Sequence, residues 1–294
     1  MLALRWRGAQ RPPSSASPAT TASLWLLEHN RQCSRLAQQQ PSWGDSQLFN
    51  AARRRVIALW QHVTANEALP ALLGAPLPTY SGYDPGADPS PSVEFAAVAE
   101  AGGVLSTGGG WLPLTDQGTL HSIGPLLERD VAFDPVFLDA CSAGDLLRGA
   151  MYQPLGAGGL SVSGDSQHYY GGRRNDAVAQ ALMRARDLGV PSYTRVRAAL
   201  GLTGPSAVSG VSPDPRTQAA LQSAYGSDVH GIDLLIGGLA EVSATAGAHL
   251  GPTLAGVFRE QFVRLRAADR FWYEHSALQD STGTPYLTDS ERAE

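Results

Sequence analysis

Two arginines and an aspartate stand together in the stretch Arg184-Ala185-Arg186-Asp187-Leu188-Gly189. Guanidinium and carboxylate groups at this spacing are typical of ion pairs that hold two chain segments together. Apolar residues recur at helical spacing on both sides of the stretch. Gly189 can adopt the left-handed conformation that ends a helix, and Pro191 suits the first turn of the next one. The residues alone therefore predict a helix–break–helix corner that is held by salt bridges.

Other residues with reactive side chains are scattered. Ser, His and Asp occur without a nucleophile elbow, no two histidines share metal-ligand spacing on one helix, and no Gly-rich phosphate loop follows a strand. His62 lies at the edge of an apolar helix face, which favours a hydrogen-bonded core histidine over a ligand. Cys33 and Cys141 are the only cysteines, which excludes a disulfide framework and a thiolate metal site. A single disulfide between them stays open.

The composition indicates a globular chain. With 294 residues, of which 43% are hydrophobic, it can form one large or two small domains. The net charge of −5 argues against nucleic acid as a main partner. No apolar run approaches the length of a transmembrane helix. The 32 glycines and 20 prolines predict long irregular connections.

Helical patterns dominate, and no segment alternates over the length of a strand, so we predict a mainly α fold. One helix runs from Thr20 to just before Pro41. A second starts at Asp45 as its cap and ends near Pro70. Asp214 and Pro215 are a cap and first residue of a helix to Tyr225, and a long helix covers Gly251 to Glu274. The apolar face predicted for the second helix consists of Leu48, Phe49, Ala52, Val56, Trp60 and Val63.

Residues 1–19 differ from the rest. They contain Arg5, Arg7 and Arg11, and no acidic residue precedes Glu28. This composition suits a transit peptide, a disordered leader or a start assigned at the wrong place; Arg11-Pro12-Pro13 spoils a long amphipathic helix and favours the last two. No clear signal peptide is visible, so the localisation is undetermined. We expect the folded domain to cover residues 20–294 and to be incomplete at both ends.

Four separated stretches resemble the C-terminal half of the animal-type haem peroxidase family, in the same order and spacing. The first resembles the family's "LWLREHNR" helix, the second its following helix, the third its "RGRDHGLPGY" corner, and the fourth its last helices. The stretches are Leu24 to Arg31, Asp45 to Gly74, Arg184 to Tyr193, and Ile232 to Glu274. The resemblance covers the chain from about Thr20 to its end.

This resemblance implies a helical domain that binds haem b. In the family one histidine ligates the iron, and a second histidine on the opposite face moves a proton within hydrogen peroxide. An arginine, a glutamine and a calcium site support that face. The implied activity is the peroxide-dependent oxidation of a small reducing substrate, connected with the response to oxidative stress. Members are usually extracellular or secretory.

The proximal haem positions are altered in this chain. Glu94 to Val104 resembles "EFATAAFRFGH", and Val104 falls where the motif has its iron-ligating histidine. Ala101 falls on the arginine that reaches a haem propionate. Ala181 falls on the asparagine that holds the proximal imidazole, and Leu188 replaces the histidine of the corner. Arg184 matches a propionate-contacting arginine and is the one haem-binding residue that the resemblance implies. We expect no catalytic or metal-ligating residue.

One branch of the family, the peroxidase-homology domains of dual oxidases, resembles the chain further. The similarity includes Tyr80-Ser81-Gly82-Tyr83, Asp88-Pro89-Ser90 and the corner from Arg186 to Tyr193. In that branch the domain lies outside the membrane, and some members lack haem and are thought to serve assembly. The distal half of the family's site lies upstream of the resemblance, and Met1 to Ala19 cannot hold it.

Three interpretations follow. The favoured one is a pseudo-peroxidase that binds a protein partner. The second is an active haem peroxidase in which His121 or His168 serves as substitute axial ligand. The third is an incomplete gene product that folds poorly, like a molten globule.

Overall fold

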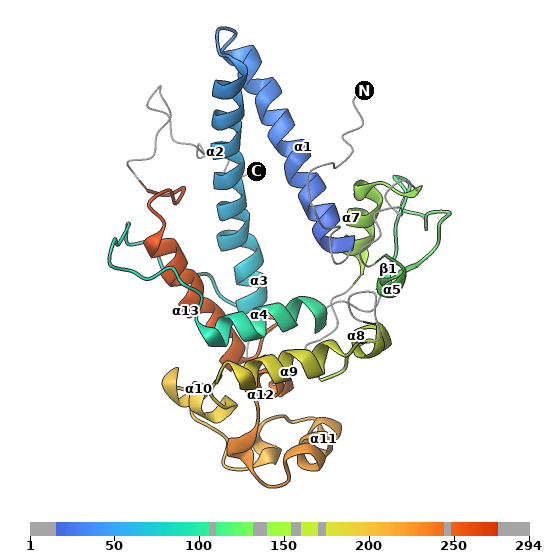
Figure 1. Cartoon of the computed structure of the whole chain (residues 1–294), viewed down its shortest axis with the longest axis vertical. Helices are drawn as coiled ribbons and strands as arrows, with labels where there is room; N and C mark the ends of the chain where they lie inside the picture. Colours follow the sequence, from blue (N-terminus) through green and yellow to red (C-terminus); the bar gives the residue numbers. More distant parts are fainter. Residues whose placement is uncertain are drawn as a thin grey trace. The chain divides into compact units, whose positions relative to one another are not determined.

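The computed structural model describes residues 16–105, 110–131, 140–153, 160–169, 175–243 and 248–275 (Figure 1). Helices make up most of the described chain. The described strands are β1 (Gly110–Trp111) and β2 (Leu126–Leu127), which pair antiparallel with Gly110 opposite Leu127. The prediction of a mainly α fold is thus confirmed.

The chain divides into two compact units. One comprises Met1–Leu27, Gly103–Gly156 and Ser161–Gln180; the other comprises Glu28–Gly102, Ala157–Leu160 and Ala181–Glu294. The predicted domain from residue 20 to residue 294 includes residues of both units, and its bounds stay a prediction. None of the described helices is both long and apolar enough to cross a bilayer.

Two helices joined by a short turn begin the described chain. They are α1 (Ala16–Gln39) and α2 (Asp45–Val63). Helix α2 passes directly into a π-helical turn, η1 (Thr64–Ala68), and then into α3 (Leu69–Leu73). Gly74 follows α3 and ends this continuous helical segment with a φ of 74°, the left-handed conformation that glycine adopts without strain. The predicted extent of the helix was therefore nearly right.

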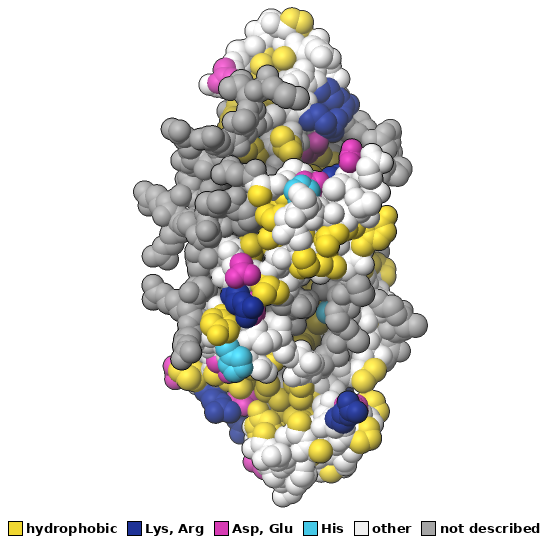
Figure 2. Space-filling view, turned by 90° about the vertical axis from the view of Figure 1, so that its right-hand side faces the viewer, with side chains coloured by type: hydrophobic (Ala, Val, Ile, Leu, Met, Phe, Trp, Pro, Cys, Tyr) yellow, Lys and Arg dark blue, Asp and Glu magenta, His cyan; other side chains and the backbone are white. Residues whose placement is uncertain are grey.

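Two details of α2 were predicted wrongly. The cap is Gly44, whose amide donates to the Gln47 side chain at 3.0 Å, and Asp45 is already helical. The buried face is also narrower than predicted: Ala52 and Val56 are buried, whereas Phe49 is 51% and Trp60 53% exposed. Apolar residues reach the surface elsewhere too, in patches between scattered charged side chains on the face shown in Figure 2.

The second unit is built around its last helices. Helix α12 (Leu234–Ala240) packs against α10 (Tyr193–Ala199) and α13 (Pro252–Ala268) through glycines. A Cβ at Gly237 would lie 2.3 Å from Cγ of Tyr193, and one at Gly238 would lie 2.5 Å from a methyl group of Leu254. Only glycine allows this approach. The remaining helices are α9 (Ala177–Asp187), which has residues in both units, η3 (Val208–Gly210), α11 (Pro215–Tyr225) and η4 (Val229–Gly231).

The predicted bounds of these helices hold in part. Asp214 caps α11 through hydrogen bonds from the amides of Arg216 and Thr217, and the helix ends at Tyr225 as predicted. Helix α13 starts at Pro252 but ends at Ala268 rather than Glu274. Asp269 is extended and its carboxylate accepts the Phe271 amide at 2.8 Å, so this local bond ends the helix.

The first unit has shorter elements around a small core of Leu126, Val131, Cys141 and Leu146. Its helices are α5 (Glu128–Val131), α7 (Ala143–Tyr152) and α8 (Gly164–His168). Ser142 and Asp145 form a capping box at the start of α7. Neither Cys33 nor Cys141 takes part in a disulfide, so the bond between them that the sequence left open is not formed. Helix α4 (Val93–Leu105) has residues in both units.

Candidate functional site

The corner between α9 and α10 has the form that the sequence predicts. Gly189 has a φ of 69°, so the chain leaves α9 through a left-handed residue. Arg186 donates to both oxygens of Asp233, at 2.9 and 2.7 Å, and the Tyr225 hydroxyl donates to the same carboxylate at 2.7 Å. The amide of Tyr193 donates to the carbonyl of Ile232 at 2.9 Å. The corner is thus salt-bridged, with a partner 47 residues further along the chain.

The pKa values of Asp233 and Tyr225 are shifted by the hydrogen bonds that hold this corner. Burial acts to raise the pKa of Asp233, but the hydrogen bonds from Arg186 and Tyr225 outweigh it, and the pKa lies below its usual value. Burial and the hydrogen bond to Asp233 raise the pKa of Tyr225 to about 12. The cluster is therefore an ionised carboxylate with two donors, which suits it to hold the corner rather than to transfer protons near neutral pH.

The positions that resemble the haem-side residues lie on α9 and α4. Arg184 is exposed on α9, and it lies two residues before Arg186, about 200° around the helix. Ala181 is partly buried one turn earlier, and Leu188 is exposed after the end of the helix. Val104 and Ala101 belong to the last turns of α4, but their side chains lie outside the described residues.

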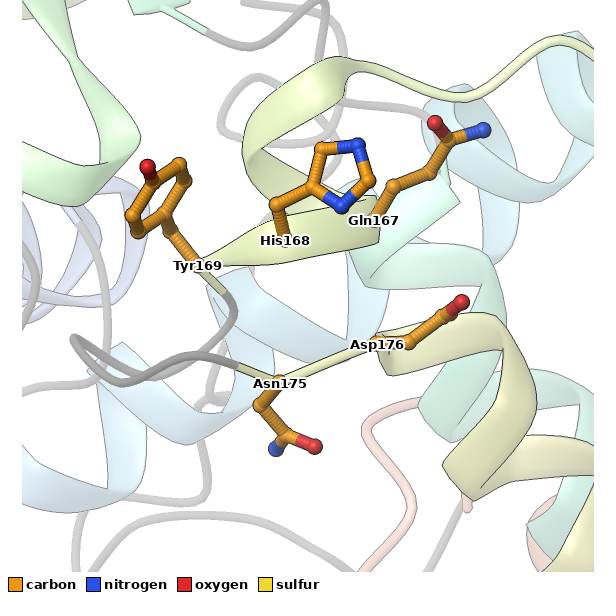
Figure 3. A pocket seen from close by; sticks show the side chains of 5 residues that line it. All are labelled: Gln167, His168, Tyr169, Asn175 and Asp176. Atoms are coloured by element: carbon orange, nitrogen blue, oxygen red, sulfur yellow. The ribbon is translucent and has the colours of Figure 1, made fainter.

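The two histidines considered as substitute ligands differ in their surroundings: His121 takes part in a local hydrogen bond, and His168 lies exposed. The Nδ1 atom of His121 accepts the Ile123 amide at 3.3 Å, so the neutral imidazole carries its proton on Nε2. His168 is exposed at the end of α8, beside a pocket of about 350 Å³. Figure 3 shows that the five side chains lining this pocket fan outward instead of meeting at one point. One of them, Asp176, accepts the amides of Val178 and Ala179 at the start of α9.

Other histidines take part in local contacts. His62 Nδ1 is 3.1 Å from the Asn66 side chain and its ring meets the edge of Tyr273, which fits the predicted hydrogen-bonded histidine. His29 packs on Phe49, and His230 lies 3.1 Å from the Thr194 hydroxyl. Within the described ranges no three His, Cys, Asp or Glu side chains gather as metal ligands would.

Sequence reasoning missed a buried polar cluster that connects α10 with the end of α12 and the start of α13. Glu241 accepts hydrogen bonds from the Tyr193 hydroxyl at 2.7 Å, from Arg197, and from the Thr253 amide and hydroxyl at 2.8 and 2.5 Å. Arg197 also donates to the Thr253 hydroxyl and to the carbonyl of Thr203. Spacing could not reveal the cluster because it joins three segments that are far apart in the sequence. We call these four side chains, Tyr193, Arg197, Glu241 and Thr253, the Glu241 cluster.

Comparison with known proteins decides the family. The family profile described as animal haem peroxidase matches residues 7–284. The chain belongs to the animal haem peroxidase family. Its relatives include dual oxidase 2 of Rattus norvegicus, which is 33% identical over 92% of this chain, and peroxinectin A of Dictyostelium discoideum, which is 32% identical over 91%.

Solved structures agree with the fold of this chain. Peroxidase A of Dictyostelium discoideum superposes with a TM-score of 0.83 and 32% identity over 91% of the chain. A fatty acid α-dioxygenase of Arabidopsis thaliana shares the fold, with a TM-score of 0.73 at 17% identity. The chain spans 19% of the rat dual oxidase 2, 50% of peroxinectin A and 52% of the peroxidase A structure.

Proposed function

We propose that this chain is a haem-peroxidase-family domain that does not carry out peroxidase turnover and acts as a folded protein-interaction module. The observation that carries the proposal is Val104. It stands in the last turn of α4, where the family motif resembled by Glu94 to Val104 has its iron-ligating histidine. A valine side chain offers no lone pair to iron.

The neighbouring positions point the same way. An iron-bound imidazole needs an acceptor for its other N–H, which orients the ring and raises its basicity. Ala181, at the position of that partner, has only a methyl group, and Ala101 has no charge for a propionate. Arg184 is the remaining polar side chain that we assign to a haem propionate. This donor set does not fit a haem held in the family's manner.

A substitute ligand has less support. His121 would have to release the Ile123 amide before its Nδ1 lone pair could reach a metal, or change its tautomer to use Nε2. His168 is exposed, and the polar side chains around it diverge (Figure 3). Hydrogen peroxide and a reducing substrate are therefore the reactants of the less favoured alternative.

A role without haem requires that the domain hold itself together. The corner of Arg186, Asp233 and Tyr225 and the Glu241 cluster are built from protein groups alone. Both belong to the second unit and connect segments that are distant in sequence. We infer a protein partner, in an assembly role like the one that the resemblance to dual oxidase domains implies.

Titration with haemin tests the proposal. The purified 294-residue chain should melt cooperatively by circular dichroism and show no sharp Soret band after haemin is added. The Val104→His variant should bind haemin weakly, and Val104→His/Ala181→Asn should bind it about 10- to 100-fold more tightly, because the asparagine restores a partner to the imidazole. Ala99→His on α4 is the matched control, since five residues place it about 140° away around the helix.

Each alternative has its own result. A sharp Soret band in the unaltered chain, with peroxide-dependent oxidation of a chromogenic donor, would establish a substitute ligand and contradict the proposal. No Soret band and no cooperative transition would favour the incomplete gene product. We expect Val104→His alone to oxidise no donor, because Ala181 leaves its imidazole without an acceptor.

A further inference from the structure

A pocket of about 570 Å³ lies in the second unit. One of its walls comes from α2 and η1, and the other comes from the C-terminal half of α13. This volume is within the range of small-molecule sites. Its walls are mainly apolar and include two indole rings. The apolar side chains include Ile57, Trp60, Leu69, Phe262, Leu265 and Trp272.

The wall on the α2 side includes the π-helical turn. Thr64 and Ala65 of η1 line the pocket together with Trp60 and Gln61 from the last turn of α2. A π-helical turn inserts an extra residue into a helix and is found frequently at functional sites. Trp60 is about half exposed although it lines the pocket, so part of its indole is accessible to an incoming molecule.

One charged group of this pocket has bonding capacity left over. Arg266 lines the pocket and is only 8% exposed. Its guanidinium donates to the carbonyl of Pro78 at 2.6 Å and lies 5.6 Å from the ring centre of Tyr80. No carboxylate in the described part of the chain forms an ion pair with it. Buried charges in proteins are normally paired, and a guanidinium has five N–H donors.

Both carboxylate oxygens of the acidic residue in the pocket already accept hydrogen bonds from the protein. Asp269 accepts the Gln61 side chain at 2.7 Å with one oxygen and the Phe271 amide at 2.8 Å with the other. Neither Asp269 nor Arg266 forms an ion pair within the described residues, but both oxygens of Asp269 accept neutral donors, whereas the Arg266 guanidinium donates to one carbonyl and keeps further N–H groups for a ligand. A buried guanidinium with N–H donors to spare in an apolar wall favours a ligand with one anionic group on an apolar body.

We propose that this pocket binds an apolar carboxylic acid, with its carboxylate on Arg266 and its body between Trp60 and Trp272. The guanidinium fork matches a carboxylate in shape, and the indoles offer flat faces to aromatic rings as well as apolar area to methylene groups. The site uses neither Val104 nor Arg184, so it does not depend on haem.

The test uses two probes of the same size. 2-Naphthoate carries the carboxylate, and 2-naphthylmethanol is its neutral counterpart; their binding to the full chain is followed by isothermal calorimetry and by tryptophan fluorescence. We expect naphthoate to bind about 10- to 100-fold more tightly, as one charge-assisted hydrogen-bonded pair would give. Decanoate as a third probe distinguishes an aliphatic from an aromatic acid, and binding of either supports the proposal.

Variants locate the site. Arg266→Gln should bind both naphthyl probes equally, and Trp60→Ala should weaken both. Arg270→Gln is the matched control: it removes the same charge from an exposed residue just after α13, outside the pocket lining, and should leave the preference unchanged. Equal binding of the two probes by the unaltered chain would overturn the proposal, and so would an Arg266→Gln variant that keeps the preference. If Arg266→Gln melts without cooperativity, the proposal is judged on two other results. These are the preference of the unaltered chain for naphthoate over naphthylmethanol and the affinity of Trp60→Ala for both probes.

Discussion

The buried carboxylate of Glu241 offers the most direct test of which contacts stabilise the second unit. Its side chain is 5% exposed and that of Arg197 is 14% exposed, so their ion pair is largely removed from water. The change to make is Glu241→Gln, because it keeps the shape of the side chain and removes only the charge and one acceptor oxygen. Arg197 is then left with Thr203 and Thr253 as neutral partners.

The expected loss follows from this burial. Removing one partner of a buried ion pair costs about 3–5 kcal/mol, since the other charge stays in a poorly solvated place. The glutamine carbonyl can still accept one of the hydrogen bonds, so we expect the lower end, about 3 kcal/mol. Domains unfold with a net stability of about 5–15 kcal/mol, so this is a large part of the total. In a domain of this size it corresponds to a fall in Tm of roughly 6–12 °C.

Circular dichroism melting and urea unfolding at pH 7 measure the difference. Glu260→Gln is the matched control, because the Glu260–Arg264 pair also belongs to the second unit but Glu260 is 51% exposed. Such an i,i+4 pair contributes only about 0.3–0.5 kcal/mol. If Glu241→Gln changed the free energy of unfolding no more than Glu260→Gln does, the Glu241 cluster would not be a support of the fold.

Three further changes probe the packing and the charges. The pKa of Asp233 is lowered in the folded chain, so its contribution to stability is present above the unfolded pKa of about 3.9 and is lost as the pH falls through the folded value. Asp233→Asn should therefore lower Tm at pH 7, and the difference in Tm from the unaltered chain should shrink in acid. The pKa of Tyr225 is raised to about 12, so stability falls as the pH rises from about 10 towards 12. Tyr225→Phe should flatten this alkaline decline in Tm. Gly237→Ala places a methyl group against the Tyr193 ring and should cost about 3 kcal/mol or more in urea unfolding, whereas Gly204→Ala, with open space around it, should cost much less.

The sequence predicted those elements whose ends are decided locally. Asp214 and Pro215 define the start of α11 because a side-chain cap and a fixed φ act within one turn. Gly189 likewise ends α9 by its own conformation. Periodicity, by contrast, finds apolar residues but not what covers them. Phe49 and Trp60 lie on the apolar side of α2 and are nevertheless about half exposed.

Contacts between distant segments escaped prediction. Arg186 was expected in a salt bridge, but nothing in its neighbourhood identifies Asp233 as the partner. The Glu241 cluster assembles from three separate segments, and the Arg266 pocket from α2, η1 and α13. Such sites follow from tertiary packing, which spacing along the chain does not encode. The resemblance to the family supplied the order of the helices, and the contacts themselves had to come from the structure.

The contacts that connect the helices of the second unit and the positions that the resemblance assigns to haem involve different residues of this chain. The corner, the Glu241 cluster and the glycines of α12 link α9, α10, α11, α12 and α13, and none of these contacts involves Val104, Ala181 or Leu188. Substitutions at the haem-side positions would therefore change iron ligation without removing a bond on which the second unit depends. This independence predicts that Val104→His/Ala181→Asn alters haemin binding with little change in Tm, whereas Glu241→Gln alters Tm whether haemin is present or not. A domain with that separation can lose its cofactor and keep a surface for a partner, which is what the proposed interaction module requires.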